Sequence, residues 1–117
     1  MKKLITSATH ALRGVSTVWK EERNFKVISV VALLVVIAMF AFEFSFVEKI
    51  FCLLSIIIVL SAEVMNTAIE DLCNKVEPNT DPVIGKIKDM SSGFVLIAAF
   101  GAAIVGLFIF LHHFFLI

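Results

Sequence analysis

A line of polar side chains runs through an otherwise apolar stretch in the middle of the chain. Successive residues of an α-helix are rotated by about 100°, so five side chains fall within a sector of roughly 100° on one helix face: Glu63, Asn66, Thr67, Glu70 and Asn74. Carboxylates at membrane depth cost a few kcal/mol or more, so they face the interior of a helix bundle and pair with other groups. An interhelical hydrogen-bonded seam is one interpretation of this face.

A second interpretation is chemical, because further charged groups gather at the same depth. Carboxylates from separate helices can hold Mg²⁺, which takes one or two of them together with waters and substrate phosphates. Glu21 and Glu22 end the predicted surface helix, Glu70 and Asp71 end the second span, and Lys88 and Asp89 begin the third. Among these, Lys88 is suited to a phosphate. Glu63 lies about 10 Å deeper than Glu70, at the depth of a lipid hydroxyl. The pattern indicates chemistry between a water-borne and a membrane-borne substrate.

The composition indicates a membrane protein. Of 117 residues, 60% are hydrophobic and 17% are charged, and the mean hydropathy of +1.01 is too high for a soluble monomer of this size. The formal net charge is zero, so no overall basic field is available for holding nucleic acid. Cys52 and Cys73 lie roughly 30 Å apart along one predicted helix, which excludes a disulfide within the chain.

The predicted fold is an all-α membrane protein, one domain over residues 1–117, with an N-terminal amphipathic surface helix and three transmembrane helices. Apolar residues recur at helical spacing among basic residues over about 1–24, as in a helix lying in the headgroup layer. The charge-free runs are Val27–Phe42, Ile50–Ala62 and Met90–Ile117. With interfacial residues included, they predict spans over about 26–44, 48–72 and 88–115.

Basic residues set the predicted orientation. Six of the ten precede the first span, three lie between the second and third spans, and Lys49 alone lies between the first and second. The positive-inside rule therefore places the N-terminus and the loop from Asp71 to Asp89 in the cytoplasm. Pro78 and Pro82 indicate that this loop is a break and not a continuous helix. The predicted location is the inner (plasma) membrane, with the active site cytoplasmic and the C-terminus outward.

Three segments resemble one family, the small prokaryotic lipid kinases, which comprise diacylglycerol kinase and undecaprenol kinase. These segments are A-E-V-M-N-T-A-I-E over 62–70, K-I-K-D-M-S-S-G over 86–93 and W-K-E-E-R-N-F-K over 19–26. The resemblance covers nearly the whole chain and the order of its spans. It implies a homotrimeric membrane enzyme of lipid metabolism and phospholipid biosynthesis. Such an enzyme transfers the γ-phosphoryl group of ATP, with Mg²⁺, to the hydroxyl of a membrane lipid alcohol.

The resemblance also implies individual roles. Glu63 matches the catalytic general base, and Glu22 and Glu70 match the carboxylates that hold Mg²⁺ and contact the nucleotide. Further positions match the nucleotide site: Lys88, Asp89, Asn79, Asp81 and, with a different residue type, His10. Positions that match the lipid side of the site or support it are Asn66, Ser92 and, with a different residue type, Lys3.

The match departs from the family pattern at the nucleotide loop. Asn74 stands where the family commonly has Asp, and Asn79 and Asp81 stand where it commonly has Glu and His. Pro78 and the Asp81-Pro82 pair are more similar to the undecaprenol kinase branch. The resemblance therefore favours undecaprenol slightly over diacylglycerol as the acceptor.

Two other classes of protein remain as alternatives. A small ion-coupled transporter would use Glu63 and Glu70 as an intramembrane ion site, but would spread its polar residues along a path across the membrane. A non-catalytic scaffold would use the glycines of the last span as close-contact positions, and would leave the polar face without a purpose. The clustering of charge toward the cytoplasmic side favours the enzyme.

Overall fold

Four helices form the part of the chain that the structure describes, residues 1–115. In this computed structural model they are α1 (Lys2–Glu21), α2 (Arg23–Ala41), α3 (Phe46–Val76) and α4 (Pro82–Phe115). No strand occurs within these residues, so the predicted all-α fold is confirmed. The last two residues of the predicted run Met90–Ile117 lie outside the described residues.

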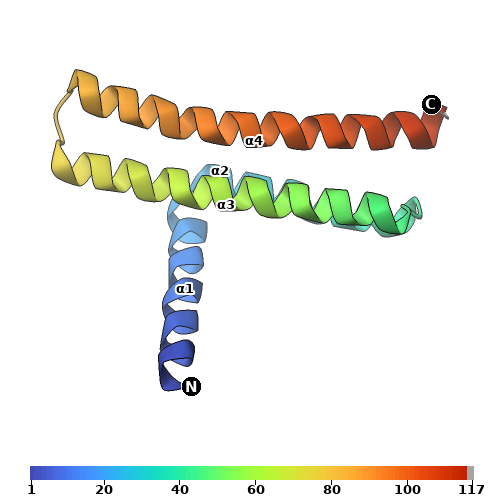
Figure 1. The fold of residues 1–117 in the computed structure, drawn as a ribbon, viewed down its shortest axis with the longest axis horizontal. Coiled ribbons are helices and arrows are strands. Elements are labelled where there is room, and N and C mark those ends of the chain that lie inside the picture. The colour runs from blue at the N-terminus through green and yellow to red at the C-terminus, as the bar shows by residue number, and fades with distance from the viewer. Residues whose placement is uncertain (116–117) are drawn as a thin grey trace.

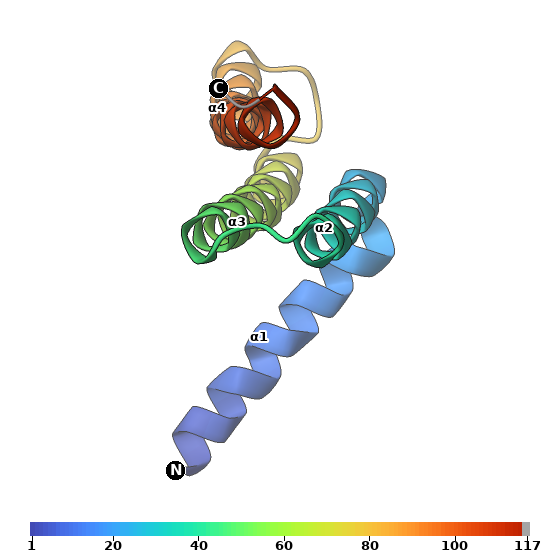
Figure 2. The ribbon, with the colours of Figure 1, turned by 90° about the vertical axis from the view of Figure 1, so that its right-hand side faces the viewer.

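The long helices α3 and α4 lie side by side and antiparallel, and α2 packs against another side of α3 (Figures 1 and 2). Thus α3 is central, while the backbones of α2 and α4 do not pack on each other. Side chains bridge them at one end only, where Met39 of α2 meets Cys52 of α3 and Ile109 of α4. The central position of α3 suits it to carry the polar face.

Helices α2, α3 and α4 are each long and apolar enough to cross a membrane. Many of their large apolar side chains are exposed, such as Leu34, Phe40, Ile97 and Phe100. A surface of this kind is stable in lipid and costly in water. The three transmembrane helices predicted from the sequence are confirmed as elements.

The N-terminal helix α1 runs away from the other three at a steep angle (Figure 1). Almost all of it is exposed, and Val18 is its one buried residue. The chain changes direction at Glu22, whose φ of −109° and ψ of 112° interrupt the helix. Trp19 and Phe25 pack edge to face across this break, with ring centroids 6.5 Å apart. The direction and exposure of α1 suit the predicted position along the membrane surface.

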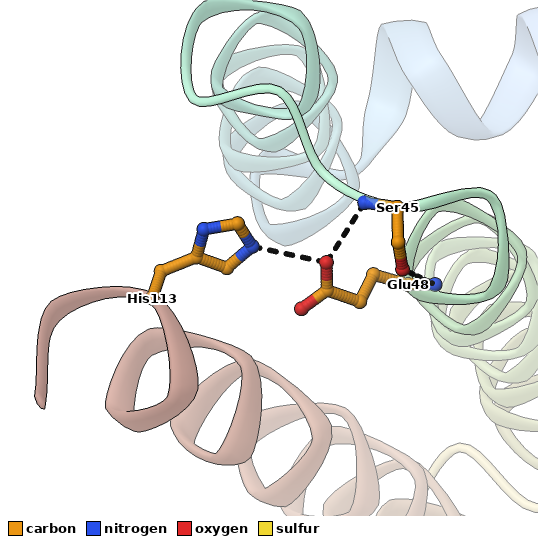
Figure 3. Close-up of polar contacts among 3 residues, drawn as sticks. All are labelled: Ser45, Glu48 and His113. Atoms are coloured by element: carbon orange, nitrogen blue, oxygen red, sulfur yellow. Dashed lines mark hydrogen bonds and ion pairs between the residues drawn. The ribbon is translucent and has the colours of Figure 1, made fainter. Parts of the chain in front are cut away.

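A capping box begins α3 and also receives a contact from α4. The Ser45 backbone N–H donates to Glu48 Oε1 (2.8 Å), and the Glu48 N–H donates to Ser45 Oγ (3.2 Å). His113 Nε2 lies 3.0 Å from the same Glu48 oxygen, and the His113 ring stacks on Phe44 at 4.9 Å (Figure 3). The far end of α4 is therefore joined to the α2–α3 turn.

The connection between α3 and α4 is shorter than predicted. The sequence interpretation gave a loop from Asp71 to Asp89, whereas α3 continues to Val76 and α4 begins at Pro82. Asp81 Oδ2 accepts the backbone N–H groups of residues 83 and 84, both at 3.0 Å, as an N-terminal helix cap does. Proline is favoured in the first helical turn because its missing N–H is not needed there. Pro82 therefore starts a helix instead of breaking one.

Candidate active site

The polar face of α3 is buried at its centre. Glu63, Asn66 and Thr67 are 4%, 8% and 6% exposed, although they lie in a chain whose helices are mostly exposed. Asn66 Nδ2 donates to Glu70 Oε1 at 3.3 Å, which links two of the predicted site residues directly. Cys52 and Cys73 also lie on α3, where both are free and buried.

Two of the predicted carboxylates, Glu63 and Glu70, lie about two turns apart on this face of α3. Glu22 is partly buried and occupies the break between α1 and α2, and α1 contacts α3. The three carboxylates therefore come from two separate parts of the chain.

Oxygen ligands of this kind fit Mg²⁺, which is held by one or two carboxylates while waters and substrate phosphates complete its coordination. Within residues 1–115, no group of three or more His, Cys, Asp or Glu side chains is placed so that it could hold a metal ion by itself. An open carboxylate set is suited to a cation that arrives with a phosphate. It is not suited to a structural metal, which needs a complete protein cage.

Helix α4 adds a cation to the same end of α3. Lys88 Nζ donates to the side-chain oxygen of Asn74, which lies one helical turn beyond Glu70 on the same face. Among residues 1–115, no ion pair joins Lys88 to a carboxylate within 4 Å. Its charge is therefore not neutralised at that distance, which leaves the predicted contact with a phosphate open to it.

Other predicted site residues lie apart from this group in the single chain. Lys3 and His10 are exposed on α1, and His10 is about 18 Å along that helix from Glu22. Asn79 is exposed in the loop, where its N–H donates to Glu77 Oε1 (3.1 Å), and Asp81 serves as the cap of α4. Asp89 and Ser92 are exposed on α4.

Sequence reasoning missed Ser91. It singled out Ser92, whereas Ser91 is the serine that α4 buries, with 6% exposure. Spacing alone does not distinguish the two serines, because Ser91 and Ser92 lie three and four residues from Lys88 and both are its neighbours on the helix surface. Thr67 was placed on the polar face but was given no role of its own.

Comparison with known proteins agrees with this geometry. The model of the family described as prokaryotic diacylglycerol kinase matches residues 9–110. The chain belongs to this family. It is 33% identical to the undecaprenol kinase of Bacillus subtilis (strain 168) over 111 residues, which are 95% of this chain and 90% of the relative. It is 27% identical to the diacylglycerol kinase of Escherichia coli (strain K12) over 112 residues, 96% of this chain and 92% of the relative.

Membership of this family identifies the chain as a membrane lipid kinase, a phosphotransferase with a lipid alcohol as the class of acceptor. Neither the family nor these relatives support the transporter alternative. The resemblance found in the three sequence segments is confirmed over most of the chain.

Proposed function

We propose that this protein transfers the γ-phosphoryl group of ATP to the hydroxyl of undecaprenol or diacylglycerol at the cytoplasmic face of the inner membrane. The observation that carries the proposal is the buried Glu63 on α3, which shares a helix face with Glu70 and with the Asn66 that bonds to Glu70. A buried carboxylate on an apolar helix is costly unless it serves a function. Family membership supports the same reaction class.

In this proposal, each group has a separate task. Glu63 accepts the proton of the lipid hydroxyl, while Glu22 and Glu70 hold Mg²⁺ and the nucleotide that it accompanies. The bound Mg²⁺ supplies positive charge to the phosphate oxygens. Lys88 contacts a phosphate, Asp89 contacts the nucleotide, and Asn66 orients Glu70 through the hydrogen bond described above. Phosphoryl transfer requires mainly this positioning and charge stabilisation.

Undecaprenol is the acceptor that we favour. The relative named undecaprenol kinase shares 33% of its aligned residues with this chain, and the relative named diacylglycerol kinase from E. coli shares 27%. The loop prolines Pro78 and Pro82 support the same choice. Both lipids present a hydroxyl at the membrane surface, so the site on α3 suits either one.

We also propose a homotrimer. In the single chain, α2 and α4 leave an apolar groove of about 330 Å³ along α3, lined by small side chains that include Ala32, Ala102 and Gly106. Small residues let helices approach closely inside membranes, which supports packing between copies. Lys3 and His10 lie far from Glu63 in one chain, so a neighbouring copy would have to supply them to a site.

The test is transfer of labelled γ-phosphate from ATP and Mg²⁺ by the purified protein in mixed micelles. Undecaprenol and diacylglycerol are offered in parallel, and the ratio of kcat/KM for the two lipids identifies the preferred acceptor. We expect label on both, with the larger kcat/KM for undecaprenol. Folded protein that labels neither lipid would contradict the proposed function, and ion flux in liposomes would then be measured.

A further inference from the structure

Three buried side-chain oxygens, two on α3 and one on α4, have no hydrogen-bond partner among residues 1–115: Asn66 Oδ1, Thr67 Oγ1 and Ser91 Oγ. Their residues are all more than nine-tenths buried. A buried polar atom without a partner destabilises a fold, and most such atoms in proteins are paired. Because three such atoms reduce the stability of the fold, their presence indicates a function other than stabilisation.

The two hydroxyls do not use the partner that helices usually offer. A Thr or Ser in a helix often donates to the carbonyl four residues earlier. In α1 of this chain, Thr9 donates to the Ile5 carbonyl and Thr17 to the Arg13 carbonyl, both at 2.9 Å. Thr67 and Ser91 make no such bond. Their hydroxyls remain available as donors to another group.

The register of α3 and α4 places Thr67 between the predicted base and the predicted metal ligand, and Ser91 at the level of the metal ligand. The Lys88–Asn74 hydrogen bond fixes the two antiparallel helices at one point. One turn further along α4 is Ser91, and one turn back along α3 is Glu70, so these two lie at the same level. Thr67 is one turn from Glu70 and one turn from Glu63 on the same face of α3. A group passing between Glu70 and Glu63 passes Thr67 and Ser91.

The chemistry of these side chains selects the group that they bind. A hydroxyl is a neutral donor, so it can donate a hydrogen bond to an anionic oxygen. It leaves the positive charge that Lys88 supplies unchanged. The free atom of Asn66 is a carbonyl oxygen, which only accepts, so it is unsuited to an anion. Rotation about χ1 by about 120° moves a serine or threonine hydroxyl between staggered positions, which turns it from the buried seam toward a ligand.

We propose that the hydroxyls of Thr67 and Ser91 donate hydrogen bonds to the non-bridging oxygens of the phosphoryl group while it is transferred. The inference rests on the proposed function. In that step the lipid oxygen forms its bond to phosphorus as the bond from phosphorus to the β-phosphate oxygen breaks. The hydroxyl proton goes to Glu63, and ADP leaves with the bonding electron pair. The two donors act on the charge that is spread over the transferred group.

Kinetics of four variants test this role. Thr67→Val and Ser91→Ala remove one donor each, Thr67→Ser keeps it, and Ser61→Ala is the control, since Ser61 is an exposed serine of α3 away from the site. We expect kcat to fall about 10- to 100-fold in each donor-deleted variant, because a hydrogen bond to a charged group is lost. The KM values for ATP and lipid should change by less than about 3-fold, as for an interaction made only in the transition state. Thr67→Ser and Ser61→Ala should keep kcat within about 3-fold of the wild type.

A second measurement does not depend on turnover. ADP, Mg²⁺ and aluminium fluoride together mimic the transferred phosphoryl group, and we expect this mixture to raise the thermal unfolding midpoint of the wild type in detergent. The rise should be smaller in Thr67→Val and Ser91→Ala, while the rise produced by ADP and Mg²⁺ alone should be the same in all variants. A merely structural role for the hydroxyls would change both rises together.

Unchanged kcat in both donor-deleted variants would overturn this inference and assign the hydroxyls to buried water. A changed oligomeric state in detergent would also overturn it, by assigning them to a contact between copies. Wild-type protein that phosphorylates neither lipid would instead contradict the proposed function itself. The inference therefore fails separately from the activity on which it rests.

Discussion

Glu63 and Glu70 lie about two turns apart on one face of α3, but their surroundings differ. Glu63 is 4% exposed, whereas Glu70 is partly exposed and accepts a hydrogen bond from Asn66. Two carboxylates in unlike environments are suited to unlike tasks, as in many enzymes that use paired acids. This difference supports the proposed roles, in which the buried Glu63 accepts a proton and the more accessible Glu70 binds a cation that arrives from water.

The first prediction concerns Glu63→Gln. We expect this variant to remain folded, because the two side chains have nearly the same shape, and to lose roughly 10²- to 10⁴-fold in kcat through loss of the proton acceptor. Lipid phosphorylation in mixed micelles measures the effect. Glu21→Gln is the matched control, because Glu21 is exposed and adjoins Glu22. Near-normal turnover of the Glu63 variant would remove this residue from the role of base.

The second prediction concerns Glu70→Gln. The amide keeps an oxygen that can accept from Asn66, so the variant removes charge more than geometry. We expect the Mg²⁺ concentration that gives half-maximal activity to rise about 10-fold or more, because the cation loses one anionic ligand. Mg²⁺ titration at fixed ATP measures this, with Asp71→Asn at the adjacent exposed position as the control. An unchanged titration would exclude Glu70 as a metal ligand.

At the scale of elements, the ends of the helices are determined by residues close together in the sequence. The packing of the helices depends on contacts between residues far apart in the sequence. The capping box of Ser45 and Glu48 follows the pattern of a serine with a glutamate three residues later. The contact between Glu48 and His113 joins residues that are 65 positions apart. It exists because α3 and α4 have lengths that bring these ends to the same level (Figure 1).

The third prediction concerns Ser45→Ala. Loss of an N-cap costs about 1 kcal/mol, so the thermal unfolding midpoint in detergent should fall by a few degrees. Catalytic activity at low temperature should stay at the wild-type level, because Glu63 lies far along α3 from this cap. Ser61→Ala serves as the control, since alanine is favourable at an exposed position inside a helix. An unaltered midpoint would show that the cap contributes little.

Much of the fold could be predicted because three apolar runs are long enough to span a bilayer and the charged residues separate them. The polar face of α3 could be predicted from helical periodicity, and in the structure its centre at Glu63, Asn66 and Thr67 is buried. The short length of the α3–α4 connection could not be predicted, because it depends on the helix cap that Asp81 provides. The choice of Ser91 over Ser92 as the buried serine depends on how α4 is rotated against α3, which a single sequence leaves undetermined.

At the scale of the whole molecule, charge and hydrogen bonding differ between the two ends of the membrane-crossing helices. One end carries Glu70, Lys88 and the α3–α4 loop, and the other carries the contact between Glu48 and His113. Basic residues on short loops favour the cytoplasmic side because their translocation is unfavourable. The proposed reaction uses ATP, which is cytoplasmic, so the proposed site belongs on that side as well. Two independent arguments therefore give the same proposed orientation.

The fourth prediction tests this orientation with single cysteines in a background where Cys52 and Cys73 are replaced by alanine. Thr80→Cys lies in the α3–α4 loop and Glu43→Cys in the α2–α3 turn, and both positions are exposed. A membrane-impermeant maleimide should label position 43 in intact bacterial cells and position 80 only in inverted vesicles. Label at position 80 in intact cells would place the carboxylates of α3 on the side without ATP. The lipid kinase assignment requires them on the other side, so this result would contradict the proposed orientation and the mechanism that depends on it.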